Sequence, residues 1–204
     1  MSPPPNKVRI LCDCNVTYNA LIYITLRLYR KVVSIIRKVI SLVLGGLSQG
    51  CAAGLCVMLG LAGEAEGYLG GFIGMSGWLP WRTRLEEILR QETDEEDNDN
   101  PFGTDGDEGA EETTEMQAVN YLRDVMDLPP LSLSTFSCLF PPVFLGHGKT
   151  DEKVPFALGN EASATSKRLG MDVEWKEYDI GHWYLVPDEI DDIVTFLNRI
   201  GALS

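Results

Sequence analysis

The sequence predicts an α/β fold, in which a mostly parallel sheet is covered by helices on both faces. Four short apolar runs are typical of buried strands, and helical patterns separate them along the chain. Strands that alternate with helices indicate parallel pairing and two outer layers. The predicted strands are residues 40–44, 71–76, 143–145 and 173–178, and a short β-like run at residues 8–12 precedes them.

The helical patterns lie at residues 24–38, 49–61, 81–91, 116–126, 155–169 and 187–200. The first of them, 24–38, has apolar side chains such as Leu28 on one face and basic side chains on another. We favour packing of its apolar face on the sheet. A second interpretation is transient contact of the basic face with an anionic membrane surface. The charges within this segment exclude a membrane span.

The charge of the chain is concentrated in one segment. The 204 residues carry a net charge of −13, and 12 acidic residues but no Lys or Arg lie at 92–115. The rest of the chain has 18 acidic and 17 basic residues. We therefore expect a single domain over 1–204 with a disordered acidic insert at about 92–115. Without clustered bases, nucleic acid is excluded as a partner.

The cysteines predict a reduced, cytoplasmic protein without a metal site. There are five cysteines, no C-x-x-C pair and no pattern typical of a secretory leader. Cys12 and Cys14 have no second pair or nearby histidine to complete a zinc site. Residues 97–103 resemble a calcium loop only weakly, because Pro101 and Phe102 replace a ligand and the required glycine. We expect no metal.

The strongest functional motif is G-x-S-x-G at residues 46–50, between a predicted strand and a predicted helix. A serine on such a turn is lifted above the sheet, and flanking glycines are needed because side chains there would collide with backbone. Ser48 is therefore the candidate nucleophile. The backbone N–H of Gln49 is the candidate donor to a developing oxyanion.

A serine hydroxyl needs a base, and the chain has two histidines. His182 follows the last predicted strand and leaves room for an acid before it, as the order Ser, acid, His of the α/β-hydrolases requires. We interpret His147 as a structural histidine. For the acid, Asp151 follows the third predicted strand, whereas Glu152 is a rival and Asp151 could instead cap the next helix.

Four blocks of sequence resemble the acyl-protein thioesterase, or phospholipase/carboxylesterase, family of α/β-hydrolases. They are VLGGLSQG at 43–50, GMSGWLP at 74–80, HGKTDEKVP at 147–155 and GH at 181–182, in the order of that family. The resemblance implies a Ser48, Asp151 and His182 triad, no cofactor, and an apolar acyl groove to which Trp78 and Leu79 belong. It implies a cytosolic hydrolase of thioesters and esters. Its substrates would be palmitoylated protein, lysophospholipid or small acyl esters.

The sequence departs from this family upstream of the nucleophile. Family members have a strand that ends in a His-Gly-rich loop, which donates the second oxyanion N–H. Only 47 residues precede Ser48, and both histidines follow it. The resemblance then implies an N-terminally truncated fold that lacks the first strands and this donor. The alternative function is a catalytically weak or inactive hydrolase-like binding protein.

Overall fold

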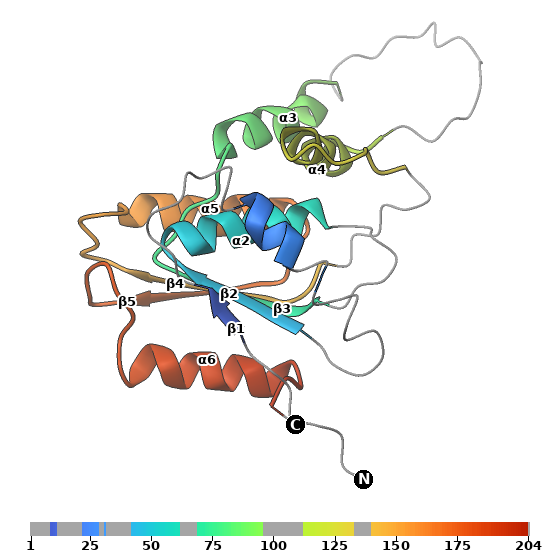
Figure 1. Ribbon diagram of the computed structural model, residues 1–204. Helices are drawn as coiled ribbons and strands as arrows, with labels where there is room; N and C mark the ends of the chain where they lie inside the picture. The colour runs from blue at the N-terminus through green and yellow to red at the C-terminus, as the bar shows by residue number, and fades with distance from the viewer. Residues whose placement is uncertain are drawn as a thin grey trace, which may run out of the picture.

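Five parallel strands form the sheet in the part of the chain that the structure describes (Figure 1). The computed structural model describes residues 9–11, 22–28, 31, 42–61, 69–95, 112–132 and 140–203. The strands lie side by side in the order of the chain. They are β1 (Arg9–Leu11), β2 (Leu42–Leu47), β3 (Leu69–Met75), β4 (Val143–Gly148) and β5 (Val173–Tyr178). The predicted α/β class and parallel sheet are confirmed.

The central strands are buried on both sides of the sheet. All of β4 is buried, and β3 is buried from Gly71 onward. Short apolar strands of this kind form because helices cover both of their faces. β1 pairs with β2 through residues 9–11 and 44–46, so β2 has strand neighbours on both sides.

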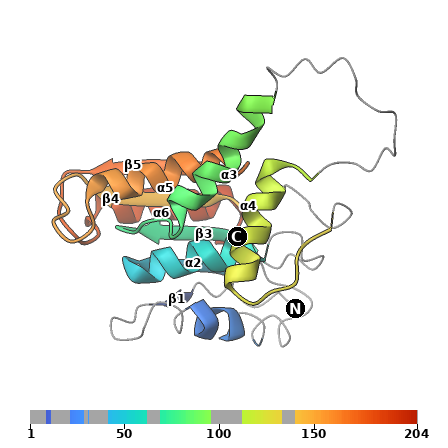
Figure 2. The same cartoon turned by 90° about the horizontal axis from the view of Figure 1, so that it is seen from above.

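Helices cover the two faces unequally (Figures 1 and 2). On one face lie α2 (Gln49–Gly60) and α5 (Phe156–Arg168), with α3 (Arg82–Glu95) and α4 (Thr114–Val125) outside them. On the other face lies α6 (Asp188–Arg199). The larger apolar core fills the first side, and a smaller cluster packs α6 on the sheet, where the Phe144 and Phe196 rings are 5.8 Å apart. Burial of these two apolar layers stabilises the sheet.

The first predicted helix is described only in part, as helical residues 22–28. Ile22 and Leu26 are buried in the larger core, which supports packing of this part on the domain. Leu28 was expected on the apolar face, but 39% of it is exposed. That expectation was wrong because the buried face of this stretch is formed by residues 22, 25 and 26. Residues 29–30 and 32–40 lie outside the described residues.

Both ends of the acidic segment 92–115, which was expected to be disordered as a whole, belong to helices or directly precede one. α3 continues to Glu95, and α4 begins at Thr114 rather than at residue 116. The earlier start has a local cause, since the Thr113 side chain accepts a hydrogen bond from the Met116 N–H at 3.3 Å. Residues 96–111 lie outside the described residues. The single-domain organisation stays a prediction.

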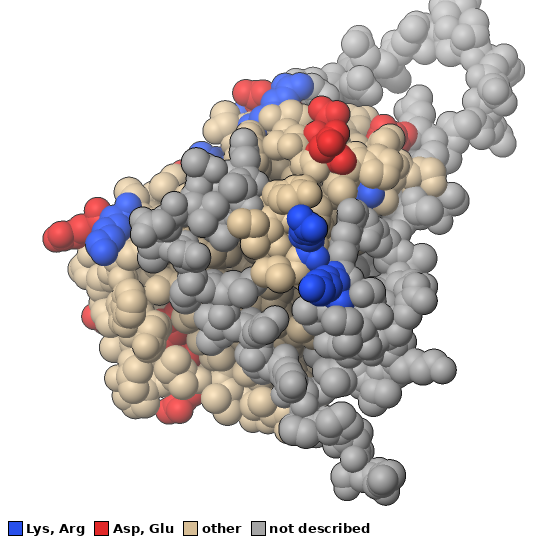
Figure 3. Space-filling view, in the orientation of Figure 1, with Lys and Arg blue, Asp and Glu red and all other residues tan. Residues whose placement is uncertain are grey.

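Charged side chains are scattered on the surface that Figure 3 shows, where described acidic and basic residues lie near one another. Arg82, for example, pairs with Glu86 at 2.8 Å. A strong single-sign field therefore does not develop over the described part of this face. Among the described helices, none combines the length and the apolar character that a membrane crossing needs.

Candidate active site

The candidate site residues lie at one edge of the sheet. Ser48 follows β2, Asp151 follows β4 and His182 follows β5. Because the carboxyl ends of parallel strands meet at the same edge, the topology gathers these three side chains. Ser76, at the end of β3, lies between them along this edge.

Ser48 lies on a strained turn between β2 and α2. Its φ of 55° and ψ of −119° are backbone angles that favour glycine. The Ser48 N–H donates to the Met75 carbonyl at 2.8 Å, and the Ser48 carbonyl accepts from the Ala52 N–H at 3.1 Å. A Cβ on Gly46 would lie 2.3 Å from the backbone carbonyl carbon of Gly50. Gly46 of the motif therefore lets strand and helix approach closely, as a nucleophile turn requires.

Gln49 is the first residue of α2 and is half-buried beside this turn. Backbone N–H groups in the first turn of a helix point away from the rest of the helix, toward the site edge. This placement suits the expected role of Gln49 as an oxyanion donor. The role itself stays a prediction.

Both carboxylate oxygens of Asp151 accept hydrogen bonds, and its side chain is fully buried. Oδ1 accepts from the backbone N–H groups of Lys153 and Val154, each at 2.9 Å. Oδ2 lies 2.8 Å from Nδ1 of His182. Burial alone raises the pKa of Asp151, but the hydrogen bonds from Val154, His182 and Lys153 outweigh it and hold the pKa below its ordinary value. Asp151 is therefore a fixed anion.

The two alternatives for the acid find no support in these contacts. Pro155 occupies the N-cap of α5, and no side chain caps that helix. Glu152 is exposed, and the carboxylate that meets His182 belongs to Asp151. The two backbone bonds to Asp151 Oδ1 close a local turn ahead of α5, which explains why a capping pattern is visible in the sequence.

The contact with Asp151 determines the tautomer of His182. Because Asp151 is an anion that accepts, Nδ1 of His182 carries the proton and Nε2 is left as the basic nitrogen. Among the described residues, no hydrogen bond joins His182 to the Ser48 hydroxyl. The structure thus brings Asp151 and His182 together and places Ser48 on the same edge of the sheet. Contacts between nucleophile and base are often long in unliganded enzymes.

His147 is buried and, like His182, lies close to Oδ2 of Asp151. Its Nε2 lies 3.0 Å from the Val154 carbonyl oxygen and 3.3 Å from Asp151 Oδ2. The expected contact with loop backbone is present, but the sequence did not predict the contact with Asp151. The spacing of four residues between His147 and Asp151 was the available signal.

The loop that carries His182 is held by residues outside the predicted set. Glu189, at the start of α6, accepts from the Leu185 N–H at 2.9 Å. Burial raises the pKa of Glu189, and the nearby charge of Asp192 raises it further. The Ser76 hydroxyl lies 3.4 Å from the Trp183 carbonyl oxygen. Nothing in the sequence distinguished Glu189 and Ser76 from polar residues without a role in the site.

A pocket of about 520 Å³ opens beside the serine turn. It is lined by Gln49, residues 78–83 and Leu158. Trp78 and Leu79, the predicted substrate-binding residues, are in this lining, with Trp78 half-buried and Leu79 buried. A concave, partly apolar surface next to the nucleophile can accept an acyl chain.

Cys51 does not compete with Ser48 as a nucleophile. Cys51, three residues after Ser48, is buried, and burial together with Cys56 raises the pKa of its thiol to about 12. It is therefore a protonated core residue. Among the described residues, no cluster of His, Cys, Asp or Glu could hold a metal ion. Cys12, Cys14 and residues 97–103 lie outside the described residues.

Comparisons with known proteins agree with this architecture. No family model matches the chain. Acyl-protein thioesterase 1 of Gibberella zeae is 28% identical over 159 residues, which cover 78% of this chain and 47% of that protein. The chain thus spans about half the length of this curated relative.

Two solved structures show the same fold. Acyl-protein thioesterase 2 of Zea mays matches with a TM-score of 0.57 and 21% identity, covering 93% of this chain and 70% of that one. Thermogutta terrifontis esterase 2, phosphoramylated by tabun, matches with a TM-score of 0.55 and 16% identity, covering 94% and 68%. The protein therefore has the α/β-hydrolase fold, and its resemblance to the acyl-protein thioesterases of the phospholipase/carboxylesterase type is confirmed.

Proposed function

We propose that this protein is a serine hydrolase that cleaves thioesters or carboxylic esters. The observation that carries the proposal is the 2.8 Å contact between Asp151 Oδ2 and His182 Nδ1, at the sheet edge where Ser48 occupies a strained turn. This arrangement leaves His182 Nε2 basic and places a hydroxyl on the same edge. Acyl transfer to a serine needs this combination.

In the proposed reaction, His182 Nε2 takes the proton of the Ser48 hydroxyl as its oxygen attacks the acyl carbonyl carbon. The Gln49 backbone N–H stabilises the tetrahedral oxyanion. His182 then returns the proton to the leaving thiolate or alkoxide, and the bond between it and the acyl carbon breaks. In the second step, His182 takes a proton from water as the water oxygen attacks the acyl carbon. The bond between this carbon and the Ser48 oxygen then breaks, His182 returns the proton to Ser48, and the carboxylic acid leaves. Asp151 stabilises the imidazolium in both steps.

The lining of the pocket favours an acyl chain beside Trp78 and Leu79. These side chains line the open pocket that begins at Gln49, one residue after the proposed nucleophile. An acyl group on Ser48 would therefore extend its chain over a partly apolar surface. This geometry requires neither a metal nor an organic cofactor for acyl transfer.

The resemblance to acyl-protein thioesterases favours an acylated protein, such as a palmitoylated one, as the substrate. Lysophospholipids and small acyl esters contain the same carboxylic ester chemistry and belong to the proposed range. A cytoplasmic location and transient contact with a membrane surface stay predictions. Rates for matched thioesters and oxygen esters of equal chain length would separate these substrate classes.

A fluorophosphonate probe tests the proposal, because it forms a covalent adduct with an activated serine. We expect labelling of the wild type and its loss in Ser48→Ala. The matched control is Ser132→Ala, which removes the hydroxyl of an exposed serine after α4, and it should stay labelled. Equal labelling of wild type and Ser48→Ala would remove Ser48 from the role.

A folded wild type that is not labelled at all would contradict the hydrolase proposal. That result would favour the alternative, a hydrolase-like protein that binds acylated protein or lipid without turnover. Circular dichroism of each variant shows that the compared proteins are folded.

A further inference from the structure

We propose that His147 is a positioning residue that holds the Asp151 carboxylate toward His182. This inference rests on the proposed function, in which Asp151 orients the base. His147 itself would touch neither the substrate nor the reacting atoms, and it would act through Asp151.

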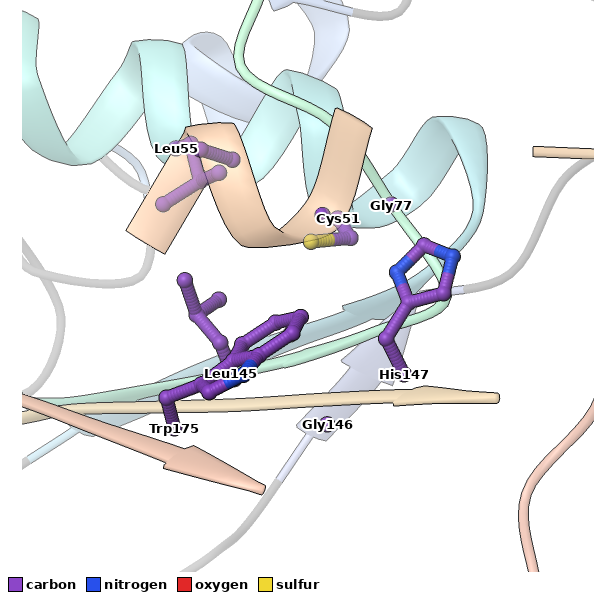
Figure 4. A pocket seen from close by; sticks show the side chains of 10 residues that line it. Cys51, Leu55, Gly77, Leu145, Gly146, His147 and Trp175 are labelled. Carbon is purple, nitrogen blue, oxygen red and sulfur yellow. The ribbon is translucent and has the colours of Figure 1, made fainter. Parts of the chain in front are cut away.

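The residues around His147 pack closely against its imidazole ring. It lies near the end of β4 with 1% of its surface exposed, and its ring points to the same side of the sheet as Trp175 (Figure 4). Its ring centroid is 6.1 Å from that of Phe156 and 6.2 Å from that of Trp175. A Cβ on Gly159 of α5 would lie 2.2 Å from Nδ1 of His147. The helix thus carries a glycine where any larger residue would displace the ring.

The surroundings leave this ring little freedom to move. The adjacent cavity, which Gly159 and Trp175 also line, has a volume of about 10 Å³. Such a cavity is at the lower limit for a single water molecule. The orientation of His147 is therefore set by packing on the ring faces and by the polar contacts of Nε2.

The polar contacts of Nε2 fix its protonation. Both neighbours, the Val154 carbonyl oxygen at 3.0 Å and Asp151 Oδ2 at 3.3 Å, can only accept a hydrogen bond. Nε2 therefore carries a proton that it donates to the Val154 carbonyl oxygen, and the same edge of the ring faces Asp151 Oδ2 at 3.3 Å.

The contacts of Asp151 then divide cleanly between its two oxygens. Oδ1 accepts two backbone N–H groups, and Oδ2 meets one imidazole on each of two sides. Val154 links the two sets, because its N–H donates to Oδ1 and its carbonyl accepts from His147. Loss of the His147 ring would remove one of the two imidazole contacts of Oδ2 and the hydrogen bond to the Val154 carbonyl together. The turn that aims the carboxylate at His182 would then be held less tightly.

The tautomer of His147 gives a test that needs no substitution. Because the chain has two histidines, ¹⁵N-histidine labelling gives two assignable rings. We expect the Nε2–H tautomer for His147 and the Nδ1–H tautomer for His182 in the unliganded protein. A neutral His147 with its proton on Nδ1 could not donate to Asp151, and this finding would overturn the proposal.

A variant series tests the consequence for the site. We expect His147→Phe to lose the downfield proton resonance of the His182 Nδ1–H. Its kcat should fall on the order of 10- to 100-fold with KM little changed. His147→Gln, which retains an N–H donor, should recover most of both signals. Phe156→Leu is the packing control, because it removes a ring contact while keeping the Nε2 donor, and it should resemble the wild type.

The outcomes separate this inference from the proposed function. If folded His147→Phe keeps both the resonance and kcat, then His147 is only a core residue and the inference is wrong. If the wild type shows the resonance but has no hydrolase activity, then the proposed function fails. The resonance alone still decides whether His147 holds Asp151.

Discussion

The serine half of the site and the acid–base half are held in place by different forces. Ser48 is placed by the main chain, through a strained φ of 55° and a backbone hydrogen bond to Met75. Asp151 and His182 are placed by hydrogen bonds to the Asp151 carboxylate, from the His182 ring at 2.8 Å and from the Lys153 N–H at 2.9 Å. The two halves should therefore fail differently. Added bulk should damage the first half, and loss of charge should damage the second.

The largest expected effect is on activity, in the half that depends on charge. Asp151→Asn keeps a carbonyl oxygen for the N–H groups of Lys153 and Val154, but its amide group turns toward Nδ1 of His182. The imidazole must then accept at Nδ1, which leaves no base at Nε2. We expect kcat for ester hydrolysis to fall about 10⁴-fold, equivalent to a barrier about 5 kcal/mol higher.

This loss of kcat counts as a loss of catalysis only if the variant is folded. Circular dichroism and thermal unfolding at neutral pH should show that Asp151→Asn is folded. A variant that retains more than a tenth of the wild-type kcat would contradict the assigned acid. Glu152→Gln, at the exposed rival position, should keep the wild-type rate.

The second effect is on stability, in the half that the backbone holds. In Gly46→Ala the new Cβ would lie within 2.6 Å of three backbone atoms of Gly50 and Cys51. Backbone cannot move aside cheaply, so we expect the free energy of unfolding to fall by about 3 kcal/mol in urea titrations. The matched control is Gly181→Ala, whose Cβ would meet its nearest atom at 3.7 Å, so it should cost less than about 1 kcal/mol. Equal costs would refute the steric explanation.

Much of the fold was predictable because it rests on local patterns. The predicted strand at 173–178 has the observed bounds, and the helix predicted at 187–200 is α6 at Asp188–Arg199. Apolar periodicity and flanking glycines carry this information. One error lies where a local contact extends an element, as Thr113 does for α4. The strands predicted at 40–44 and 143–145 also end too early, since β2 continues to Leu47 and β4 to Gly148. The buried face of residues 22–28 depends on tertiary packing, which a single sequence does not contain.

The sequence predicted the two parts of the site unequally, again because local structure can be recognised in a sequence and long-range contacts cannot. The turn around Ser48 is a local structure, so five consecutive residues indicate it. The acid–base half joins residues 31 positions apart, and order along the chain gave only candidates for the acid. His147 looked structural because its distance to Asp151 depends on how the loop after β4 folds back. The contact of Glu189 with the His182 loop was not visible for a similar reason.

A smaller effect tests the strain at the nucleophile. Ser48→Gly relieves the positive φ, so we expect the free energy of unfolding to rise by about 1 kcal/mol although the hydroxyl is lost. Ser48→Ala loses the same hydroxyl but keeps the strain, and its stability should stay within about 0.5 kcal/mol of the wild type. Chemical denaturation of the three proteins measures the difference. Indistinguishable glycine and alanine variants would mean that the turn stores no strain.

The smallest effect is the pH dependence of stability, which only the acid–base half should show. The folded-state pKa of Asp151 lies below the ordinary value of 3.8, despite burial, because Val154, His182 and Lys153 donate to its carboxylate. A depressed pKa stabilises the fold above the unfolded value, and this stabilisation is lost as pH falls through the folded value. The stability of the wild type relative to Asp151→Asn should therefore be constant above about pH 5 and decrease below about pH 4.

Ser48→Ala serves as the comparison for this titration, because it changes the half that carries no charge. Its stability relative to the wild type should be the same at every pH, in urea titrations over the same range. If the wild type and Asp151→Asn keep a constant difference down to about pH 3, the carboxylate is not preferentially stabilised in the folded state. The acid–base half would then be held by packing, as the serine half is held by its backbone, and the distinction between the two halves would disappear.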